Sequence, residues 1–194
     1  YSLAPEAQFP RQIEEIGRVF RALLDEGRSP DTIVLVGDSA GGGLVLSAMT
    51  AWRREGVPAP ASVALLSPLV DCAGMSDTHH SVEATDPVFG DLALASLPVI
   101  LRLYAPDRDA RDPAVSPVYA SYVGAPPLLV HAGSREVLLG DAARLCERAR
   151  DDGAEAHLRV HDGMFHLFHM HGRLAAARRA YADLARFVAS TTGL

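Results

Sequence analysis

The stretch Val34-Leu35-Val36-Gly37-Asp38-Ser39-Ala40-Gly41 decides the fold. Its apolar start and the small residues that follow it predict a strand, a sharp turn and a helix, with Ser39 at the apex. A Gly-x-Ser-x-Gly pentapeptide in that setting is typical of a nucleophile elbow, whose strained turn exposes the serine. Only small residues fit two positions before and after the serine, a need that Gly37 and Gly41 meet. The turn also directs the Ala40 N–H to the point where an oxyanion forms, so Ala40 is the predicted oxyanion donor. The alternative is a glycine-rich turn with an idle serine.

Length and composition indicate one globular α/β domain. The chain has 194 residues, of which 48% are apolar, enough for a sizeable core and unlike a disordered chain. A net charge of −6 argues against nucleic acid or an anionic membrane surface as a partner. The sequence shows no apolar run of membrane-spanning length and no signal segment, so a cytoplasmic location is expected. Cys72 and Cys146 are predicted to be reduced thiols.

Strands and helices are expected to alternate along the chain. Continuous apolar runs predict strands over 32–38, 62–70 and 128–132, and an alternating pattern predicts a fourth strand over 155–161. Helical spacing of apolar residues predicts helices over 11–26, 40–55, 140–152 and 171–190. This alternation implies a parallel sheet with helices on both faces. Residues 73–124, called the insert below, are irregular and loop-rich, with one or two helices expected over 88–105. Asp86-Pro87 would begin this helical stretch and Pro98 would break it.

Three strand ends carry side chains that can do chemistry. Ser39 follows the first strand, Glu136 the third and His166 the fourth. The carboxyl ends of parallel strands meet at one edge of the sheet, where the active sites of such folds lie. A serine hydroxyl needs a base to take its proton, and the base needs an acid to orient it. Because the three residues follow the chain order serine, acid, histidine, they are the predicted catalytic triad.

Other acids and histidines lie near these strand ends. Asp141 is a second candidate acid, but its place in the first turn of a helix is explained more simply by the helix dipole. His161 falls within the fourth strand, and His169 lies nearer the last helix. His79 and His80 lie in a polar loop and are expected to be solvated. The histidines show no zinc-type spacing with a carboxylate, so no metal is expected.

Five short motifs are spread over almost the whole chain. They are Tyr1-Ser2-Leu3-Ala4-Pro5-Glu6, Gly37-Asp38-Ser39-Ala40-Gly41-Gly42, Ser67-Pro68 with Asp71, Asp112-Pro113 with Ser116-Pro117, and Gly163-Met164-Phe165-His166. In combination and order they resemble the bacterial hormone-sensitive-lipase-like esterases, a branch of the α/β-hydrolases. The resemblance implies hydrolysis of small carboxylic esters through an acyl-enzyme, without a cofactor. It places Glu136 where the family often has Asp, and it implies a homodimer formed through the last strand.

One motif of that family is missing from the sequence. Members carry a His-Gly-Gly-Gly loop well upstream of the Tyr1–Glu6 segment, and its N–H groups complete the oxyanion hole. We therefore expect an N-terminally incomplete hydrolase domain over residues 1–194, the C-terminal part of the fold, with the Ser39 strand at an apolar edge of the sheet. Each lost oxyanion donor typically costs on the order of 10²–10³ in turnover. The chain is accordingly expected to be weakly active or inactive alone.

Two other functions are compatible with the sequence. An amide deacylase or arylformamidase-like hydrolase would use the same Ser39, Glu136 and His166. A catalytically impaired hydrolase-fold fragment, serving as a binding or interaction module, would keep the fold without turnover. Paired ester and amide substrates separate the first from an esterase, and a stable fold without turnover would mark the second.

Overall fold

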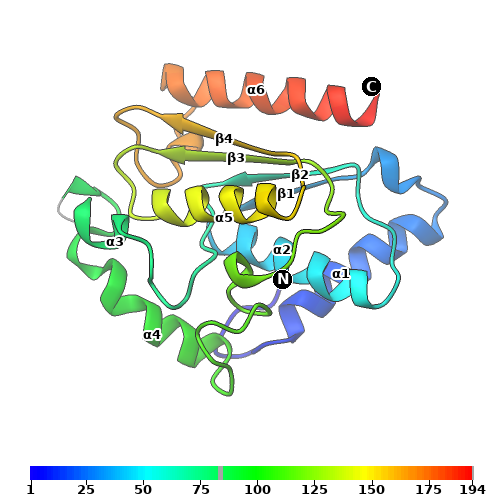
Figure 1. The fold of residues 1–194 in the computed structure, drawn as a ribbon, viewed down its shortest axis with the longest axis horizontal. Helices are drawn as coiled ribbons and strands as arrows, with labels where there is room; N and C mark the ends of the chain where they lie inside the picture. Colours follow the sequence, from blue (N-terminus) through cyan, green and yellow to red (C-terminus); the bar gives the residue numbers. More distant parts are fainter. Residues whose placement is uncertain (83–84, 194) are drawn as a thin grey trace.

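The chain builds one parallel sheet. The computed structural model describes residues 1–82 and 85–193, and Figure 1 shows its ribbon. In these residues β1 (Val34–Asp38), β2 (Ser62–Leu66), β3 (Leu128–Gly133) and β4 (Ala156–His161) lie side by side in chain order. Each strand runs parallel to its neighbour. Continuous apolar runs predict this arrangement, because a parallel sheet is buried on both faces, and the predicted α/β fold is confirmed.

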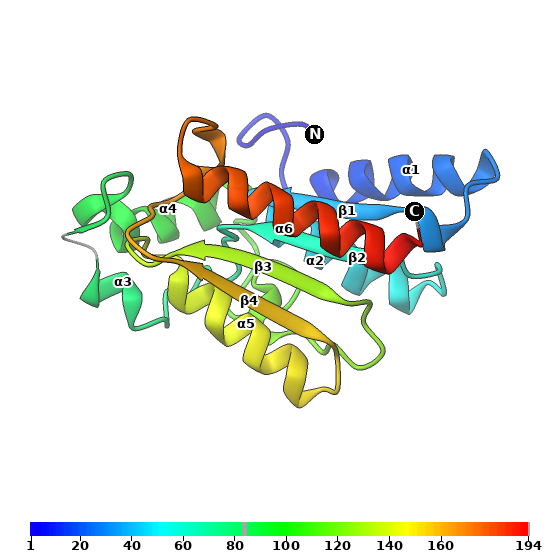
Figure 2. The same ribbon diagram turned by 90° about the horizontal axis from the view of Figure 1, so that it is seen from above.

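Helices cover both faces of the sheet (Figures 1 and 2). They are α1 (Arg11–Asp25), α2 (Ala40–Arg54), α5 (Leu139–Asp151) and α6 (Ala175–Thr192). α6 lies along one face, α2 and α5 lie on the other, and α1 packs on α2. Phe20 of α1 stacks on Trp52 of α2, with ring centroids 4.8 Å apart. α6 buries the small side chains Ala176, Ala177 and Ala180, which lets the helix approach its neighbours closely.

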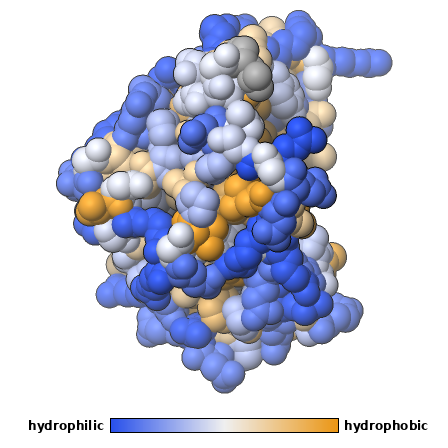
Figure 3. Space-filling view, turned by 90° about the vertical axis from the view of Figure 1, so that its right-hand side faces the viewer, coloured by the Kyte–Doolittle hydropathy of each residue, from blue (hydrophilic) through white to orange (hydrophobic). Residues whose placement is uncertain are grey.

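The central strands are buried and the outer strands are partly exposed. Every residue of β2 and β3 is buried. β1 and β4 each pair on one side only, and Val36 and Val160 are 51% and 50% exposed. Figure 3 shows one face of the molecule, where apolar side chains gather in a small area of a mostly hydrophilic surface. Because β1 is the first strand in the sheet order and its Val36 is exposed, the strand that leads to Ser39 lies at an apolar edge of the sheet, as predicted.

The insert contains short helical elements and corrects two expectations. Its elements are α3 (Thr78–Ser81), η3 (Gly90–Leu92), α4 (Ala93–Tyr104) and η4 (Pro117–Tyr119). No helix begins at Pro87, because Asp86 caps a turn instead: its Oδ1 accepts the N–H groups of Val88 and Phe89 at 2.8 and 3.2 Å. Pro98 lies inside α4 and does not break it. Pro98 is exposed, so water can satisfy the carbonyl group that its ring leaves without a partner.

Both cysteines are free and buried, as predicted. Burial raises the pKa of the Cys146 thiol to about 11 and also raises the pKa of Cys72. Both groups therefore stay protonated near neutral pH and behave as small apolar side chains. Over the described ranges, the structure has no helix that is both long and apolar enough to cross a membrane.

Candidate active site

Ser39 occupies a strained turn between β1 and α2. Its backbone has φ +47° and ψ −123°, values that a residue with a side chain rarely adopts. Two hydrogen bonds hold it there: the Ser39 N–H donates to the Leu66 carbonyl, and the Leu69 N–H donates to the Ser39 carbonyl, both at 3.0 Å. Ala40 is the first residue of α2, so its N–H has no intrahelical acceptor. This geometry is that of a nucleophile elbow.

The two glycines of the elbow differ in how much space surrounds them. A Cβ added to Gly37 would lie 2.6 Å from the Gly41 carbonyl oxygen and 2.7 Å from the Gly42 Cα, which real Cβ atoms do not show. A Cβ added to Gly41 would meet only the Asp38 Oδ1, at 3.4 Å. The expectation that both positions exclude larger residues is therefore supported at Gly37 and not at Gly41.

Gly37→Ala is expected to lower the free energy of unfolding by about 1–3 kcal/mol, because the added methyl overpacks rigid backbone. Gly41→Ala is the matched control and is expected to change stability by less than about 0.5 kcal/mol, since this half-buried site has room for a methyl group. Urea unfolding followed by circular dichroism measures both changes. Equal losses in the two variants would contradict the packing argument.

The structure brings the three predicted triad residues together. The Ser39 Oγ lies 3.0 Å from the His166 Nε2, and the His166 Nδ1 lies 3.4 Å from the Glu136 Oε2. Glu136 is fully buried, and its other oxygen, Oε1, accepts the Gly133 N–H at 3.1 Å. A carboxylate beside Nδ1 favours the tautomer with its proton on that atom, which leaves Nε2 free to accept the serine proton. The arrangement can therefore pass a proton from the hydroxyl to the ring.

Two residues for which the sequence predicts no role at the site hold His166 in place. The ring of Phe89, from the insert, lies against the imidazole with centroids 4.7 Å apart. The Ser67 Oγ accepts the N–H of Leu167 at 3.2 Å, and both Ser67 and Leu167 have positive φ. Ser67 belongs to a motif that the sequence shows, but its contact with the histidine loop is tertiary and leaves no local signal.

Asp141 has other partners than His166. It lies in the first turn of α5, as predicted, and is fully buried. Its Oδ1 accepts the Ser76 hydroxyl at 2.7 Å and lies 2.9 Å from the His79 Nε2, while its Oδ2 accepts the Asp71 N–H at 3.1 Å. The expectation that His79 is solvated is wrong, since the side chain is 1% exposed. The insert folds back onto the start of α5, and this contact removes His79 from water.

A second group of histidines lies between β3, β4 and α6. The His131 Nδ1 and the His161 Nε2 are 2.8 Å apart, and His169 packs edge-on against both rings. Burial lowers the pKa of His131 to about 4 and that of His169 to about 3, and neighbouring histidines add to the effect. Among the described residues, no set of three or more His, Cys, Asp or Glu side chains is arranged to hold a metal ion.

These histidines are expected to make the fold less stable as the pH falls. Their pKa in the folded chain lies below the ordinary value of 6.5, so the unfolded chain binds the protons first. Stability is then full above about pH 6.5 and declines toward about pH 4, by at most about 1.4 kcal/mol per pH unit for each histidine. Urea unfolding between pH 7 and pH 5 measures the slope. His169→Phe is expected to flatten it and the exposed-site control His171→Phe to leave it unchanged; equal slopes in all three chains would refute the assignment.

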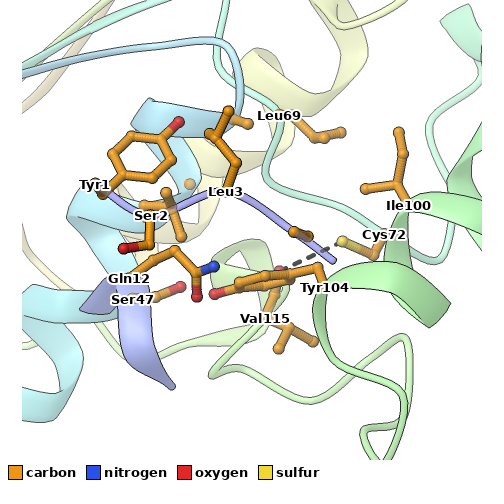
Figure 4. Close-up of a pocket in the computed structure, with 14 residues that line it drawn as sticks. Tyr1, Ser2, Leu3, Gln12, Ser47, Leu69, Cys72, Ile100, Tyr104 and Val115 are labelled. Atoms are coloured by element: carbon orange, nitrogen blue, oxygen red, sulfur yellow. Dashed lines mark hydrogen bonds between the residues drawn. The ribbon is translucent and has the colours of Figure 1, made fainter. Parts of the chain in front are cut away.

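Two adjoining cavities flank the elbow. One, of about 260 Å³, is lined by Ser39 and Ala40 and by largely apolar side chains that include Phe89, Leu97 and Leu138. The other, of about 200 Å³, shares three residues with it and is drawn in Figure 4. The shared residues are Ala40, Leu69 and Ile100. Tyr1, Leu3 and Tyr104 contribute much of the second wall. Apolar space therefore lies on both sides of the predicted oxyanion donor.

Comparison with known proteins identifies the family of the chain. The family described as alpha/beta hydrolase fold matches residues 1–170. An acetyl-hydrolase of Streptomyces hygroscopicus is 35% identical over 194 residues, which cover 100% of this chain and 64% of that protein. An esterase of Acinetobacter venetianus is 33% identical, over 98% of this chain and 62% of its own length.

Solved structures give the same result. An esterase from the bacterial hormone-sensitive lipase family is 37% identical, with a TM-score of 0.92, over 99% of this chain and 64% of that one. An esterase/lipase from an uncultured bacterium has a TM-score of 0.93 at 35% identity, over 100% and 64% of the two chains. The chain thus spans less than two thirds of the length of these relatives. The resemblance to hormone-sensitive-lipase-like esterases is confirmed, and the chain belongs to the α/β-hydrolase-fold family.

Proposed function

We propose that this chain is the triad-bearing part of a serine carboxylesterase that acts on small, apolar esters. The observation that carries the proposal is the 3.0 Å contact between the Ser39 Oγ and the His166 Nε2 on a strained elbow, with the Glu136 carboxylate behind the ring. Relatives described as esterases and acetyl-hydrolases support the reaction class. The apolar cavities on both sides of Ala40 support small acyl and alcohol groups without charge.

The three triad residues have different roles in the proposed reaction. The Ser39 hydroxyl attacks the ester carbonyl while His166 takes its proton, and the resulting oxyanion receives the Ala40 N–H. His166 then gives that proton to the departing alcohol, which leaves the acyl group on Ser39. A water molecule, deprotonated by His166, attacks the acyl-enzyme and releases the carboxylic acid. Glu136 keeps the proton of Nδ1 directed toward itself and stabilises the imidazolium in both steps.

The number of oxyanion donors limits the rate at which the chain can hydrolyse an ester. The family resemblance implies that the remaining oxyanion donors are N–H groups of a His-Gly-Gly-Gly loop. This sequence does not occur among the 194 residues. Each absent donor lowers turnover by on the order of 10²–10³. We therefore expect slow acylation of the chain as it stands. The expected dimer through the last strand also stays a prediction; it concerns β4, whose outer edge pairs with no other strand in the part of the chain that the structure describes.

Covalent labelling tests the proposal even when turnover is slow. The chain is incubated with a fluorophosphonate, digested, and mapped by mass spectrometry. A single adduct on Ser39 is expected, because its hydroxyl lies 3.0 Å from the His166 Nε2, which can take its proton. The exposed serines Ser2 and Ser121 serve as internal controls, and a urea-unfolded sample measures background reactivity. Adducts spread over exposed serines would contradict the proposal.

Hydrolysis of p-nitrophenyl butyrate but not of the corresponding anilide would exclude the amide deacylase.

A further inference from the structure

The peptide unit next to Glu136 is held by the insert. The Val137 N–H donates to the Asp86 Oδ2 at 2.9 Å, and the Val137 carbonyl accepts the Thr78 hydroxyl at 2.6 Å. The Thr78 Oγ1 also accepts the Gly140 N–H at 2.8 Å. Both backbone polar groups of the residue that follows the acid are thus bonded to side chains of the insert. Asp86 is 4% exposed, so its bonds face little competition from water.

Glu136 itself has few bonds that would fix its carboxylate. Its Oε1 accepts the Gly133 N–H, whereas its Oε2 has no hydrogen-bond partner among the described residues and lies 3.4 Å from the His166 Nδ1. The carboxylate therefore depends on the position of its own backbone, between the end of β3 and the start of α5. That backbone is the part that Thr78 and Asp86 hold.

Asp86 also connects the loop of Glu136 to Phe89, whose ring packs on His166. Its Oδ2 binds the Val137 N–H, and its Oδ1 accepts the N–H groups of Val88 and Phe89. The Phe89 ring in turn packs on His166 and lines the cavity beside Ser39. One buried carboxylate thus sets the distance between the loop of the acid and the side chain that covers the base.

We propose that Thr78 and Asp86 are positioning residues that place Glu136 against His166, an inference that rests on the proposed function. They touch neither the substrate nor the reacting atoms. Their bonds hold the acid in the orientation that keeps the Nδ1 proton in place, a geometry in which a displacement of about 1 Å can cost on the order of 10²-fold in rate. The insert, which also walls the cavity, is in this way part of the proton-transfer apparatus.

Two nearly isosteric substitutions test the inference in the 194-residue chain. Thr78→Val removes both hydroxyl bonds without a change of charge. Asp86→Asn keeps an oxygen that can cap Val88 and Phe89 but turns an N–H₂ toward the Val137 N–H. Each variant is expected to lower kcat for p-nitrophenyl butyrate by on the order of 10- to 100-fold, with KM within about twofold and a melting temperature within about 5 °C.

Matched controls come from the same segment. Thr85→Val removes an exposed hydroxyl that donates to the local Val82 carbonyl. Asp112→Asn alters another Asp-Pro turn, in which the Asp112 Oδ1 accepts the Ala114 N–H. Both controls are expected to keep kcat within about twofold. Equal losses of kcat in the controls and in the Thr78 and Asp86 variants would overturn the inference, because they would show a general weakening of the insert.

A double-mutant cycle separates positioning from a merely structural role. When Glu136 is already replaced by Gln, adding Thr78→Val is expected to lower kcat by less than about twofold, since the group it positions is gone. Losses that multiply instead would overturn the inference. The two proposals fail differently: turnover that persists in Ser39→Ala refutes the proposed function, whereas Ser39-dependent turnover that is unchanged in Thr78→Val and Asp86→Asn refutes only the positioning role.

Discussion

Ser39→Ala is expected to reduce the hydrolysis of p-nitrophenyl butyrate to the uncatalysed background. Without the hydroxyl no acyl-enzyme forms, and His166 has no proton to take. When the rest of the machinery is complete, such a loss reaches on the order of 10⁶-fold in kcat. In this chain the ratio of the wild-type rate to the background rate is expected to be smaller, because the sequence supplies one predicted oxyanion donor, Ala40. Initial rates at saturating substrate, followed at 400 nm on the order of hours, measure the difference.

Ser121→Ala is the matched control for that variant. Ser121 is exposed, and its Oγ accepts the Val123 N–H far from the elbow in sequence. It is expected to keep the wild-type rate. Circular dichroism should show the same fold in all three chains, because Ser39→Ala removes no buried polar partner other than the His166 Nε2 contact. Wild-type turnover in Ser39→Ala would contradict the assignment of Ser39 as the nucleophile.

Glu136→Gln is expected to lower kcat toward the Ser39→Ala background with little change in KM; in a complete machinery the loss is on the order of 10⁴-fold. The structure gives the reason. The Oε1 of this side chain accepts the Gly133 N–H, so the amide oxygen of Gln takes that place and its N–H₂ faces the His166 Nδ1. The imidazole then carries its proton on Nε2 and can no longer accept one from Ser39. Steady-state kinetics of the purified variant measures both constants.

Asp141→Asn decides between the two candidate acids. Asp141 bonds Ser76, His79 and the Asp71 N–H and makes no contact with His166 in the described structure. Its replacement is expected to lower the melting temperature and to leave kcat of the folded fraction within an order of magnitude. The opposite result, full turnover in Glu136→Gln and none in Asp141→Asn, would move the role of the acid to Asp141.

The features that the sequence predicts are the local ones. Apolar runs predict three strands and an alternating pattern predicts the fourth, while the elbow around Ser39 follows from a strand, two glycines and the start of a helix. The triad positions follow because parallel strands bring their carboxyl ends together. His79 shows the opposite case. It lies in a polar stretch, and only the fold of the insert onto α5 buries it beside Asp141.

Tertiary contacts account for the rest. Pro98 continues a helix that its ring alone would interrupt, because that side of α4 faces water. Thr78 lies in no motif, and Asp86-Pro87 predicts only the start of a helix, since the groups that both side chains bind are backbone atoms of a loop 59 and 51 residues away. Such contacts depend on how two segments that are distant in sequence pack together, and local sequence patterns contain no information about that packing.

The bonds between the insert and Val137 limit how this chain can be re-engineered. Segments that cover an active site are natural candidates for exchange between relatives when a new substrate range is wanted. A graft of the whole insert into this chain would remove Thr78 and Asp86 together with the cavity wall, so selectivity and catalytic rate would be inherited as one unit. A graft that begins after Phe89 and is confined to α4, which supplies Leu97 and Ile100, would alter the wall alone. The junction of a useful chimera therefore lies at residue 90, inside the insert rather than at its ends.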